Sequence, residues 1–339
     1  MAIGITIFRS FGITLLMADG NDLLVWALID DRAGNKSQCL GVAEALGRRF
    51  EIRNLEYTPV AALPNFVIGA SFGGLSARSR ANLTPPWPDV VISAGRRSAP
   101  IARNIKKLNG AETFLAQIMY PGDSGADEFD LIAVPGHDNL SPRPNLMTIT
   151  GAPHRITTAS LAEAAEEWKE RFQALPRPWI ALIVGGSTKR RTFTNSMARE
   201  LGRAACDMAA KAGGSLLVST SRRSGEAADV LIKEITCPGY VYRWGDEGKN
   251  PYVGYLATAD AVIVTGDSVS MCSEACAAPV PVYLYAPAAL ITGKHARLHQ
   301  ALFNGGYARP LGDALEDWTH PPLNPADEVA AEIRRRLGR

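Results

Sequence analysis

The residues best suited to chemistry follow an apolar run late in the chain. Ala261 to Val264 has the composition of a strand buried on both faces, and Thr265 to Ser268 interrupts it with a glycine and helix-capping residue types. A helix from Val269 to Ala277 would begin with bare backbone N–H groups near Ser268, Val269 and Ser270, and these groups suit a phosphate. Glu274, one turn further on, could accept hydrogen bonds from ribose hydroxyls. The alternative is a capped helix whose Glu274 is merely solvated.

Two other predicted strands in the second half also end in small or polar residues. Gly185, Gly186 and Ser187 follow the strand that starts at Trp179, and Thr220, Ser221 and Arg222 follow the strand that starts at Ser215. The carboxyl ends of parallel strands meet at one edge of a sheet, so these turns should converge on the turn at Gly266. Asn250 opens a predicted short helix that precedes the strand Ala261–Val264, and we group it with these turns as a candidate for nucleotide binding. None is a Walker loop or a G-x-G-x-x-G motif, which disfavours NTP hydrolysis and a conventional NAD site.

The first half carries another polar turn, from Asp30 to Ser37, between the predicted strand Leu23–Ile29 and the predicted helix Gln38–Arg49. Its length and charge favour a substrate-binding or catalytic loop that includes Asn35 and Lys36. The alternative is a plain connection in which Ser37 caps the helix.

Three further features of the first half leave alternatives open. Arg96 and Arg97 precede a predicted helix, where their charges oppose the helix dipole unless an anion lies there; solvated surface arginines are the alternative. His137 precedes Asp138 and could transfer a proton, although a structural histidine in a turn is favoured. Residues 58–86 are irregular and form either an acceptor-side loop or an amphipathic surface segment.

Composition narrows the function classes. The chain has 339 residues, 46% of them hydrophobic, and a formal net charge of +2, which provides no electrostatic basis for nucleic-acid binding. Its five cysteines show no CxxC pair and no zinc-site spacing, so we expect no metal and reduced thiols in the cytoplasm. No apolar run is long enough to span a bilayer. Residues 1–20 are predicted to be a disordered extension, and Met17 is an alternative start.

Strands alternate with helices through both halves, which predicts an α/β protein with two Rossmann-like domains, each with a mostly parallel sheet. We expect an N-terminal domain over residues 21–175 and a nucleotide domain over residues 176–322. A final helix within residues 323–339 should return to the first domain. Pro176-Arg177-Pro178 is the predicted hinge.

Several segments together resemble the bacterial ELM1-like family, which is named after a plant mitochondrial-fission protein. They are DDRAGNKSQCLGVAEAL, ISAGRRSAP, GGSTKRRTFT, LLVSTSRR, EGKNPYVGYLATADAVIVTGDSVSMCSEA and WTHPPLN. The resemblance extends from Leu24 to Leu337 and so covers nearly the whole chain. The family is similar to GT-B glycosyltransferases, especially the enzyme that transfers N-acetylglucosamine onto the lipid-linked peptidoglycan precursor. This similarity implies that the two parallel sheets face each other across a cleft, with residues 21–175 as the acceptor domain and residues 176–322 as the nucleotide-sugar domain.

The resemblance implies roles for particular residues. Gly266 to Ser270 would hold a diphosphate without a metal, Glu274 would bind the ribose, and Gly185-Gly186-Ser187 with Arg222 would complete the cradle. The first domain would carry the acceptor, and there the sequence departs from the related enzyme. Asn35 stands where that enzyme has a histidine, and an amide cannot act as a general base. Asp31 is then the nearest candidate base, with Asp30 and His137 behind it. Repulsion from a nearby carboxylate would raise the pKa of Asp31 towards that of a useful base, whereas Arg32 and Lys36 would oppose the rise.

The sequence and the resemblance together favour two functions. The first is metal-independent transfer of a sugar from a nucleotide-sugar, with a UDP-sugar favoured, to an envelope glycolipid or related acceptor at the inner-membrane surface. Such a protein would be cytoplasmic or peripheral on the cytoplasmic membrane face, with no tightly bound cofactor. The second is a non-catalytic nucleotide-sugar-binding or interaction protein of the same fold.

Overall fold

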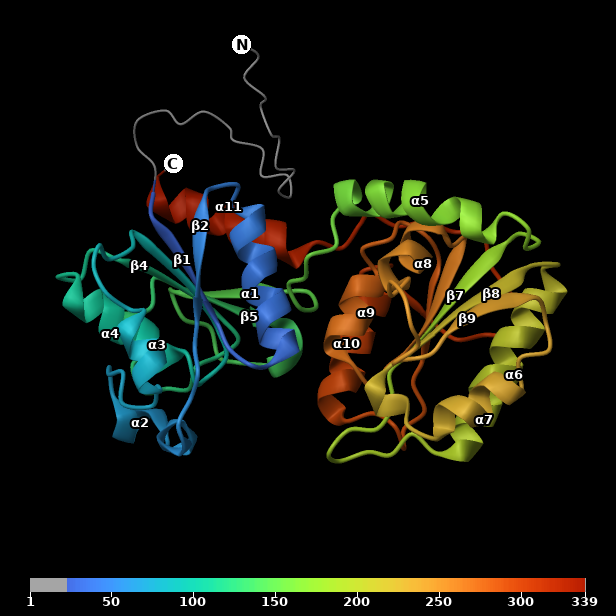
Figure 1. Cartoon of the computed structure of the whole chain (residues 1–339), viewed down its shortest axis with the longest axis horizontal. Coiled ribbons are helices and arrows are strands. Elements are labelled where there is room, and N and C mark those ends of the chain that lie inside the picture. The colour runs from blue at the N-terminus through green and yellow to red at the C-terminus, as the bar shows by residue number, and fades with distance from the viewer. Residues whose placement is uncertain (1–22, 339) are drawn as a thin grey trace, which may run out of the picture.

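The computed structural model describes residues 23–338, in which two separate parallel sheets carry the fold (Figure 1). Both sheets have six strands. This arrangement confirms the predicted pair of Rossmann-like α/β domains. The predicted extension over residues 1–20 and the alternative start at Met17 lie outside the described residues.

The N-terminal sheet has the strand order β2-β1-β3-β4-β5-β6. Its strands are β1 (Val25–Ile29), β2 (Phe50–Asn54), β3 (Val90–Ala94), β4 (Phe114–Ile118), β5 (Leu131–Pro135) and β6 (Leu146–Ile149). The connections contain α1 (Ala33–Ala45), η1 (Pro59–Ala62), α2 (Asn65–Ile68), α3 (Ala77–Ala81), α4 (Ala99–Leu108), η2 (Ala126–Glu128) and η3 (Gly136–Asp138). The segment 58–86, which looked irregular in the sequence, therefore holds three short helices.

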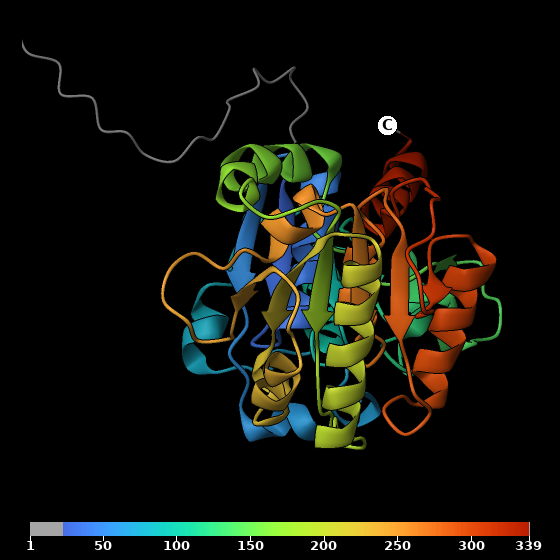
Figure 2. The ribbon, with the colours of Figure 1, turned by 90° about the vertical axis from the view of Figure 1, so that its right-hand side faces the viewer.

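The C-terminal sheet has the strand order β12-β11-β10-β7-β8-β9. Its strands are β7 (Trp179–Val184), β8 (Ser215–Thr220), β9 (Gly239–Tyr242), β10 (Ala261–Thr265), β11 (Val282–Tyr285) and β12 (Arg309–Pro310). The helices of this half are α5 (Thr158–Phe172), α6 (Asn195–Lys211), η4 (Arg222–Ser224), α7 (Ala227–Lys233), α8 (Tyr252–Thr258), α9 (Val269–Ala275) and α10 (Gly293–Asn304). Figure 2 looks onto this half of the molecule.

Helices cover both faces of each sheet, and this explains why the strands are apolar throughout. In β1, Val25, Ala27 and Ile29 pack in one core with α1, whereas Trp26 and Leu28 pack in another with α4. Every residue of β7 and β10 is buried. The strands are thus held firmly, and the turns at their carboxyl ends are positioned by a rigid support.

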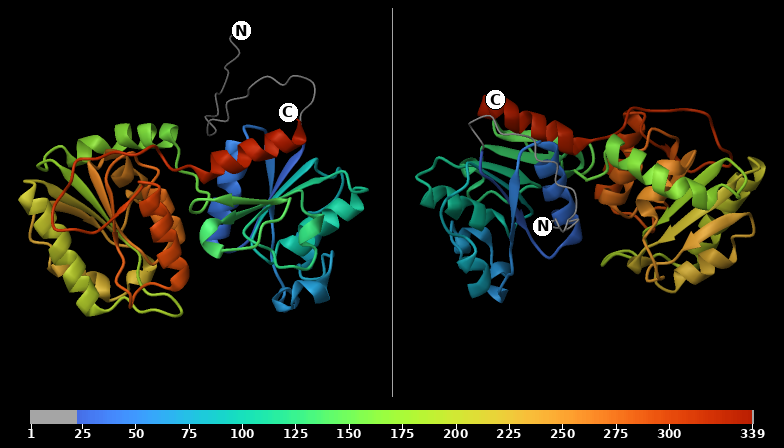
Figure 3. Two further views of the ribbon diagram at one scale, coloured as in Figure 1. Left: turned by 180° about the vertical axis from the view of Figure 1, so that it is seen from behind. Right: turned by 45° about the horizontal axis from the view of Figure 1, so that its top comes forward.

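Two segments of chain connect the domains. The first follows β6, and its His154 Nε2 lies 3.1 Å from the carbonyl oxygen of Leu323 in the second segment. The second leads into α11 (Pro325–Leu337), which packs on the N-terminal domain through Val329, Ala330 and Ile333 (Figure 3). Arg334 of α11 also donates to the carbonyl oxygen of Ala45 at 3.0 Å.

The placement of α5 corrects the predicted domain boundary at residue 175. Trp168 and Phe172 of α5 belong to the core of the C-terminal domain, and the Phe172 ring lies 5.8 Å from the ring of Trp179. The predicted hinge is also held within that domain, because Arg177 Nη1 donates to Asp260 Oδ1 at 2.6 Å. The connection between the domains comes earlier, between β6 and α5.

Candidate functional site

The turns after β7, β8 and β10 come together at the carboxyl edge of the C-terminal sheet. Gly185 N donates to Thr265 Oγ1 at 2.7 Å, and Ser221 Oγ donates to the carbonyl oxygen of Gly185 at 2.5 Å. Ser187 N donates to the carbonyl oxygen of Arg223 at 2.9 Å. These bonds join three turns from distant parts of the sequence into one surface, which we name the donor platform.

Asp267 lies at the centre of the donor platform, with its side chain fully buried. Its Oδ2 accepts hydrogen bonds from Gly186 N at 3.1 Å and from Arg223 Nη1 at 2.5 Å. Its Oδ1 is buried without a hydrogen-bond partner among the described residues. A Cβ on Gly185 would lie 2.5 Å from the carboxylate oxygens, so this turn needs glycine to admit Asp267. The sequence predicted a ligand contact for Asp267, but the contacts of its side chain hold the platform together.

The first turn of α9 borders the platform and faces the other domain. Ser268 Oγ accepts a hydrogen bond from Met271 N at 3.3 Å and so caps the helix, while Val269 and Ser270 are half-buried. A Cβ on Gly34, at the start of α1, would lie 3.9 Å from Ser270 Oγ. The amino ends of α1 and α9 therefore face each other across the boundary between the domains.

The arginine that holds the platform is Arg223, whereas the sequence pointed to Arg222. Arg222 is exposed and makes no side-chain hydrogen bond among residues 23–338. Arg223 is half-buried; its Nη1 also lies 3.3 Å from the carbonyl oxygen of Gly186, and its Nη2 lies 3.9 Å from Met271 Sδ. Arg222 and Arg223 both lie in the short helix η4, where successive side chains point in different directions, so the sequence alone could not choose between them.

Two other predicted nucleotide-binding residues have local bonding partners. Thr220 Oγ1 accepts a hydrogen bond from Trp244 N at 2.9 Å, which connects the ends of β8 and β9. Asn250 Oδ1 accepts from Tyr252 N at 3.0 Å and orders the start of α8. These contacts give both residues structural roles.

Glu274 forms a polar pair with Tyr252. The Tyr252 hydroxyl donates to Glu274 Oε2 at 2.7 Å, and burial raises the pKa of the Glu274 carboxyl. This pairing leaves the other carboxylate oxygen for a further donor. Glu274 is therefore not the freely solvated residue of the alternative interpretation, and Tyr252 is a neighbour that the sequence did not reveal.

The start of α10 adds residues to this region that sequence reasoning did not assign. His295 Nδ1 accepts a hydrogen bond from Thr292 N at 3.3 Å within the first turn, and burial is the main cause of its lowered pKa. His299 Nε2 lies 2.9 Å from the carbonyl oxygen of Gly266, and burial lowers the pKa of His299 to about 4. His299 is therefore neutral at pH 7 and donates to that carbonyl. A Lys-His pair after a strand was the only sequence signal.

In the N-terminal domain, the turn after β1 is shorter than predicted, because α1 already begins at Ala33. Asn35 and Lys36 thus belong to the first turn of the helix, and Ser37 does not cap it. The buried Asp30 carboxylate accepts from Asn35 Nδ2 at 2.9 Å and from Arg32 N at 3.1 Å. Asp30 orders this turn, and Asn35 is one of its partners.

Arg97 neutralises the two aspartates of this turn. Its Nη2 donates to Asp30 Oδ2 at 3.1 Å and also to Asp31 Oδ1. The hydrogen bond from Arg97 lowers the pKa of Asp31, so the predicted rise in this pKa through repulsion from Asp30 is wrong. The physical reason is that a cation lies between the carboxylates and outweighs their mutual repulsion. Arg97 also lies over the ring of Tyr57, at 4.3 Å from its centroid.

Arg96 binds the chain itself. Its guanidinium donates to the carbonyl oxygens of Leu63 at 2.6 Å and Ala61 at 2.9 Å, and to Asn65 Oδ1 at 3.0 Å. With Arg97 paired to carboxylates, neither arginine needs an external anion to balance the dipole of α4. The reason for expecting an anion site at Arg96 and Arg97 is therefore removed.

His137 is buried in η3, where the N-terminal domain contacts α10. Its Nε2 lies 3.9 Å from Asp138 Oδ1, too far for a hydrogen bond, and burial lowers the pKa of His137 to about 4. Asp138 instead pairs with Lys294 Nζ at 2.6 Å, and the carbonyl oxygen of His137 accepts from Arg297 Nε at 2.8 Å. The His137–Asp138 segment therefore bridges the domains, which favours a structural role over proton transfer.

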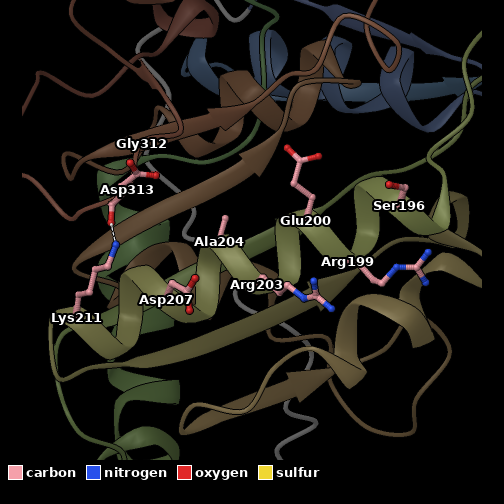
Figure 4. A pocket seen from close by; sticks show the side chains of 9 residues that line it. All are labelled: Ser196, Arg199, Glu200, Arg203, Ala204, Asp207, Lys211, Gly312 and Asp313. Carbon is pink, nitrogen blue, oxygen red and sulfur yellow. Dashed lines mark hydrogen bonds between the residues drawn. The ribbon is translucent and has the colours of Figure 1, made fainter.

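Two concave regions differ in their relation to these residues. A pocket of about 400 Å³ lies beside Asp30, Asp31, Tyr57 and Arg97, at the carboxyl edge of the N-terminal sheet. A groove of about 410 Å³ runs along α6, where Lys211 Nζ donates to the carbonyl oxygen of Asp313 at 3.0 Å (Figure 4). Figure 4 shows both signs of charge along this groove, and it contains no predicted site residue. Of these two regions, the first is the one lined by predicted site residues, Asp31 and Arg97 among them.

Within residues 23–338, no group of three or more His, Cys, Asp or Glu side chains is arranged to hold a metal ion. The helices of the same range include no candidate for a membrane span.

Solved structures with a similar fold include sugar-nucleotide enzymes. The crystal structure of MurG from Acinetobacter baumannii has a TM-score of 0.51 at 14% identity, over 92% of this chain and 99% of that one. The UDP-GlcNAc 2-epimerase of Methanocaldococcus jannaschii, in complex with UDP-GlcNAc and UDP, has a TM-score of 0.52 at 12% identity, over 94% of this chain and 100% of that one. These likenesses show that the fold is GT-B-like.

The sequence comparison identifies the family. The mitochondrial fission protein ELM1 of Arabidopsis thaliana is 30% identical over 296 residues, which cover 80% of this chain and 69% of the plant protein. The family model for mitochondrial fission ELM1 matches residues 33–337, a range that contains nearly every contact described above. The chain therefore belongs to the mitochondrial fission ELM1 family.

Proposed function

We propose that this protein is a metal-independent glycosyltransferase that takes its sugar from a nucleotide-sugar, with a UDP-sugar as the favoured donor. The observation that carries the proposal is the donor platform, in which three turns are joined around Asp267 at the carboxyl edge of a parallel sheet. Ligands of open α/β sheets bind at this edge. The similar fold of an epimerase solved with UDP-GlcNAc and UDP supports the choice of donor.

In this proposal the donor lies across the platform with its diphosphate at the first turn of α9. Val269 and Ser270 open this helix, so their backbone N–H groups lack acceptors within it and can donate to phosphate oxygens. Arg223 Nη2 adds a cationic donor, because only Nη1 is committed to Asp267. Glu274, oriented by Tyr252, accepts from the ribose hydroxyls.

The transfer step breaks the bond between the sugar and the diphosphate, and the diphosphate gains negative charge as it leaves. Fixed N–H donors and an arginine stabilise that charge without any metal. The acceptor hydroxyl approaches from the pocket beside Asp31. Its oxygen forms the new bond to the sugar carbon that the diphosphate leaves, and its proton passes to a carboxylate in that pocket. An envelope glycolipid is the proposed acceptor, which would place the protein at the cytoplasmic face of a membrane.

A second candidate, nucleotide-sugar binding without transfer, is favoured by the state of the predicted bases. Asp30 already accepts hydrogen bonds from Arg32, Asn35 and Arg97. Arg97 lowers the pKa of Asp31, and burial lowers the pKa of His137 to about 4. Neither Asp31 nor His137 therefore has a pKa near neutrality, where a general base works best.

Two measurements test the proposal in sequence. Thermal shift with UDP, GDP, ADP, CMP and their sugars should show the largest stabilisation with a UDP-sugar. Release of free nucleotide should then depend on a lipid extract added as acceptor. Binding without any release would support the second candidate, and no stabilisation by any nucleotide would refute both.

A further inference from the structure

Four large apolar side chains project into solvent from the segment that follows β2. The exposed fractions are 44% for Val60, 44% for Leu63, 74% for Phe66 and 56% for Val67. We name these four residues the apolar tip. They come from η1, α2 and the connection between them, at the carboxyl end of the N-terminal sheet. Soluble surfaces seldom gather so many apolar side chains without a partner.

The apolar tip is held in place by the polar groups beneath it. Asn65 is buried; its Nδ2 donates to the carbonyl oxygens of Pro121 at 3.0 Å and Arg96 at 3.2 Å. Arg96 in turn donates to four acceptors of the same segment. At the base of the loop, Thr58 N donates to the carbonyl oxygen of Gly74 at 2.9 Å. Polar side chains face inward and apolar ones outward, so the exposure is built into the loop.

A basic turn lies at the same end of the other domain. Lys189, Arg190 and Arg191 follow β7 and are all exposed. Thr188 orders this turn, because its Oγ1 accepts from Arg191 N at 3.2 Å. Within residues 23–338, none of the three basic side chains has a carboxylate at ion-pair distance. Their charges are therefore available to an external anionic surface.

Figures 1 and 3 place α2 and the turn between β7 and α6 at the same end of the molecule, on different domains; both lie at the bottom of these views. A compact partner touching only one domain would leave one of the two features unused. An extended, flat, negatively charged surface contacts both at once. We propose that this end of the protein docks on an anionic lipid bilayer, with the apolar tip inserted among the acyl chains and Lys189, Arg190 and Arg191 at the headgroups.

Two contributions to the free energy of binding favour this docking. Insertion removes the apolar side chains from water, and the basic turn gains from the negative surface potential of the lipids. Neither is sufficient by itself for firm attachment, because a small apolar contact binds membranes only marginally. The carboxyl edges of both sheets, which carry the candidate site, would then open toward the bilayer.

The test is flotation of the full chain with vesicles, without any nucleotide. Vesicles of phosphatidylglycerol and phosphatidylcholine should carry the protein at low salt, and pure phosphatidylcholine vesicles should carry about tenfold less or lower. The double variants Phe66→Ser/Val67→Ser and Arg190→Ser/Arg191→Ser should each reduce binding about tenfold or more. A Phe66→Trp variant should shift its fluorescence to shorter wavelength when anionic vesicles are added. No nucleotide-sugar is present in this experiment, so its outcome does not depend on whether the proposed transferase function is correct.

Matched controls lie at the opposite edge of the N-terminal sheet. Leu108, at the end of α4, is 50% exposed, and Arg48 and Arg49 are exposed before β2. Leu108→Ser and Arg48→Ser/Arg49→Ser should bind vesicles like the unmodified protein. Equal loss in these controls, equal binding to uncharged vesicles or no flotation would each overturn the proposal. If the unmodified protein were a dimer that does not bind vesicles, and Phe66→Ser/Val67→Ser made it a monomer, the apolar tip would be a contact with a second copy of the chain. That outcome would also overturn the proposal.

Discussion

The guanidinium of Arg223 donates to the buried carboxylate of Asp267 at 2.5 Å, and this ion pair joins the turn after β8 to the turn after β10. Gly186 N donates to the same carboxylate oxygen at 3.1 Å, which adds the turn after β7. One buried charge thus organises three turns. Removing either partner would leave the other without compensation, and such losses are costly in a protein interior.

The first prediction tests whether the donor platform depends on close packing at Gly185. A Cβ there would lie 2.5 Å from the Asp267 carboxylate oxygens, so Gly185→Ala must displace Asp267 or the turn. We expect the free energy of unfolding to fall by about 1–3 kcal/mol and nucleotide binding to be lost. Gly312→Ala is the control, because nothing lies within 4 Å of a Cβ at that position. Urea unfolding and calorimetry measure both effects, and equal behaviour of the two variants would contradict the prediction.

The second prediction concerns ribose recognition by Glu274. Glu274→Ala should leave the fold intact and reduce nucleotide affinity about tenfold to a hundredfold, because a charge-assisted hydrogen bond contributes roughly 1.5–3 kcal/mol. Tyr252→Phe removes the hydroxyl that orients the carboxylate at 2.7 Å, and should cause a smaller loss. An unchanged dissociation constant for folded Glu274→Ala protein, measured calorimetrically, would exclude the ribose role.

The third prediction concerns Asp31 as the base in the transfer reaction. Asp31→Asn should slow single-turnover transfer roughly a hundredfold or more while donor affinity changes little. Arg97 lowers the pKa of this carboxyl, so the unmodified protein keeps it ionised throughout the range from about pH 5 to 8. The rate should therefore show no acid limb between about pH 5 and 8. A loss under about threefold would redirect the search to His137, and an acid limb near about pH 6 would show that the base is not Asp31.

The fourth prediction concerns the pH dependence of stability. Burial lowers the pKa of His154 to about 4, whereas the unfolded chain protonates near pH 6.5. Between these values the unfolded state binds the additional proton, so stability is complete above about pH 6.5 and decreases as the pH falls toward 4. His137 and His299 act in the same direction, because their pKa values are also lowered to about 4.

When the pH is lowered from 7.5 to 5, the urea midpoint of the unmodified protein should therefore decrease. The free energy of unfolding should decrease by an amount on the order of 1 kcal/mol per histidine. His154→Gln retains a donor for the carbonyl of Leu323 but cannot titrate, so its stability should change less over this range. Identical slopes for the variant and the unmodified protein would show that His154 does not carry this dependence.

The order of the elements could be predicted from the sequence because each buried strand is locally apolar and each turn carries its own glycine or polar residues. Ala261 to Thr265, for example, is β10 almost as predicted, and the glycine after it ends the strand. The convergence of the turns after β7, β8 and β10 followed from parallel topology alone. The sheet that α5 covers, by contrast, could not be determined from the sequence of that helix.

The partners of each polar side chain were decided only by the tertiary structure. Asp31 and Arg97 are 66 positions apart, and their pairing reversed the expected direction of the Asp31 pKa. Arg223 rather than Arg222 reaches Asp267, because the path of the chain after β8 determines which side chain points inward. Local sequence specifies which residues are apolar or able to bend the chain, whereas the charge state of a site depends on groups that only folding brings within a few ångströms.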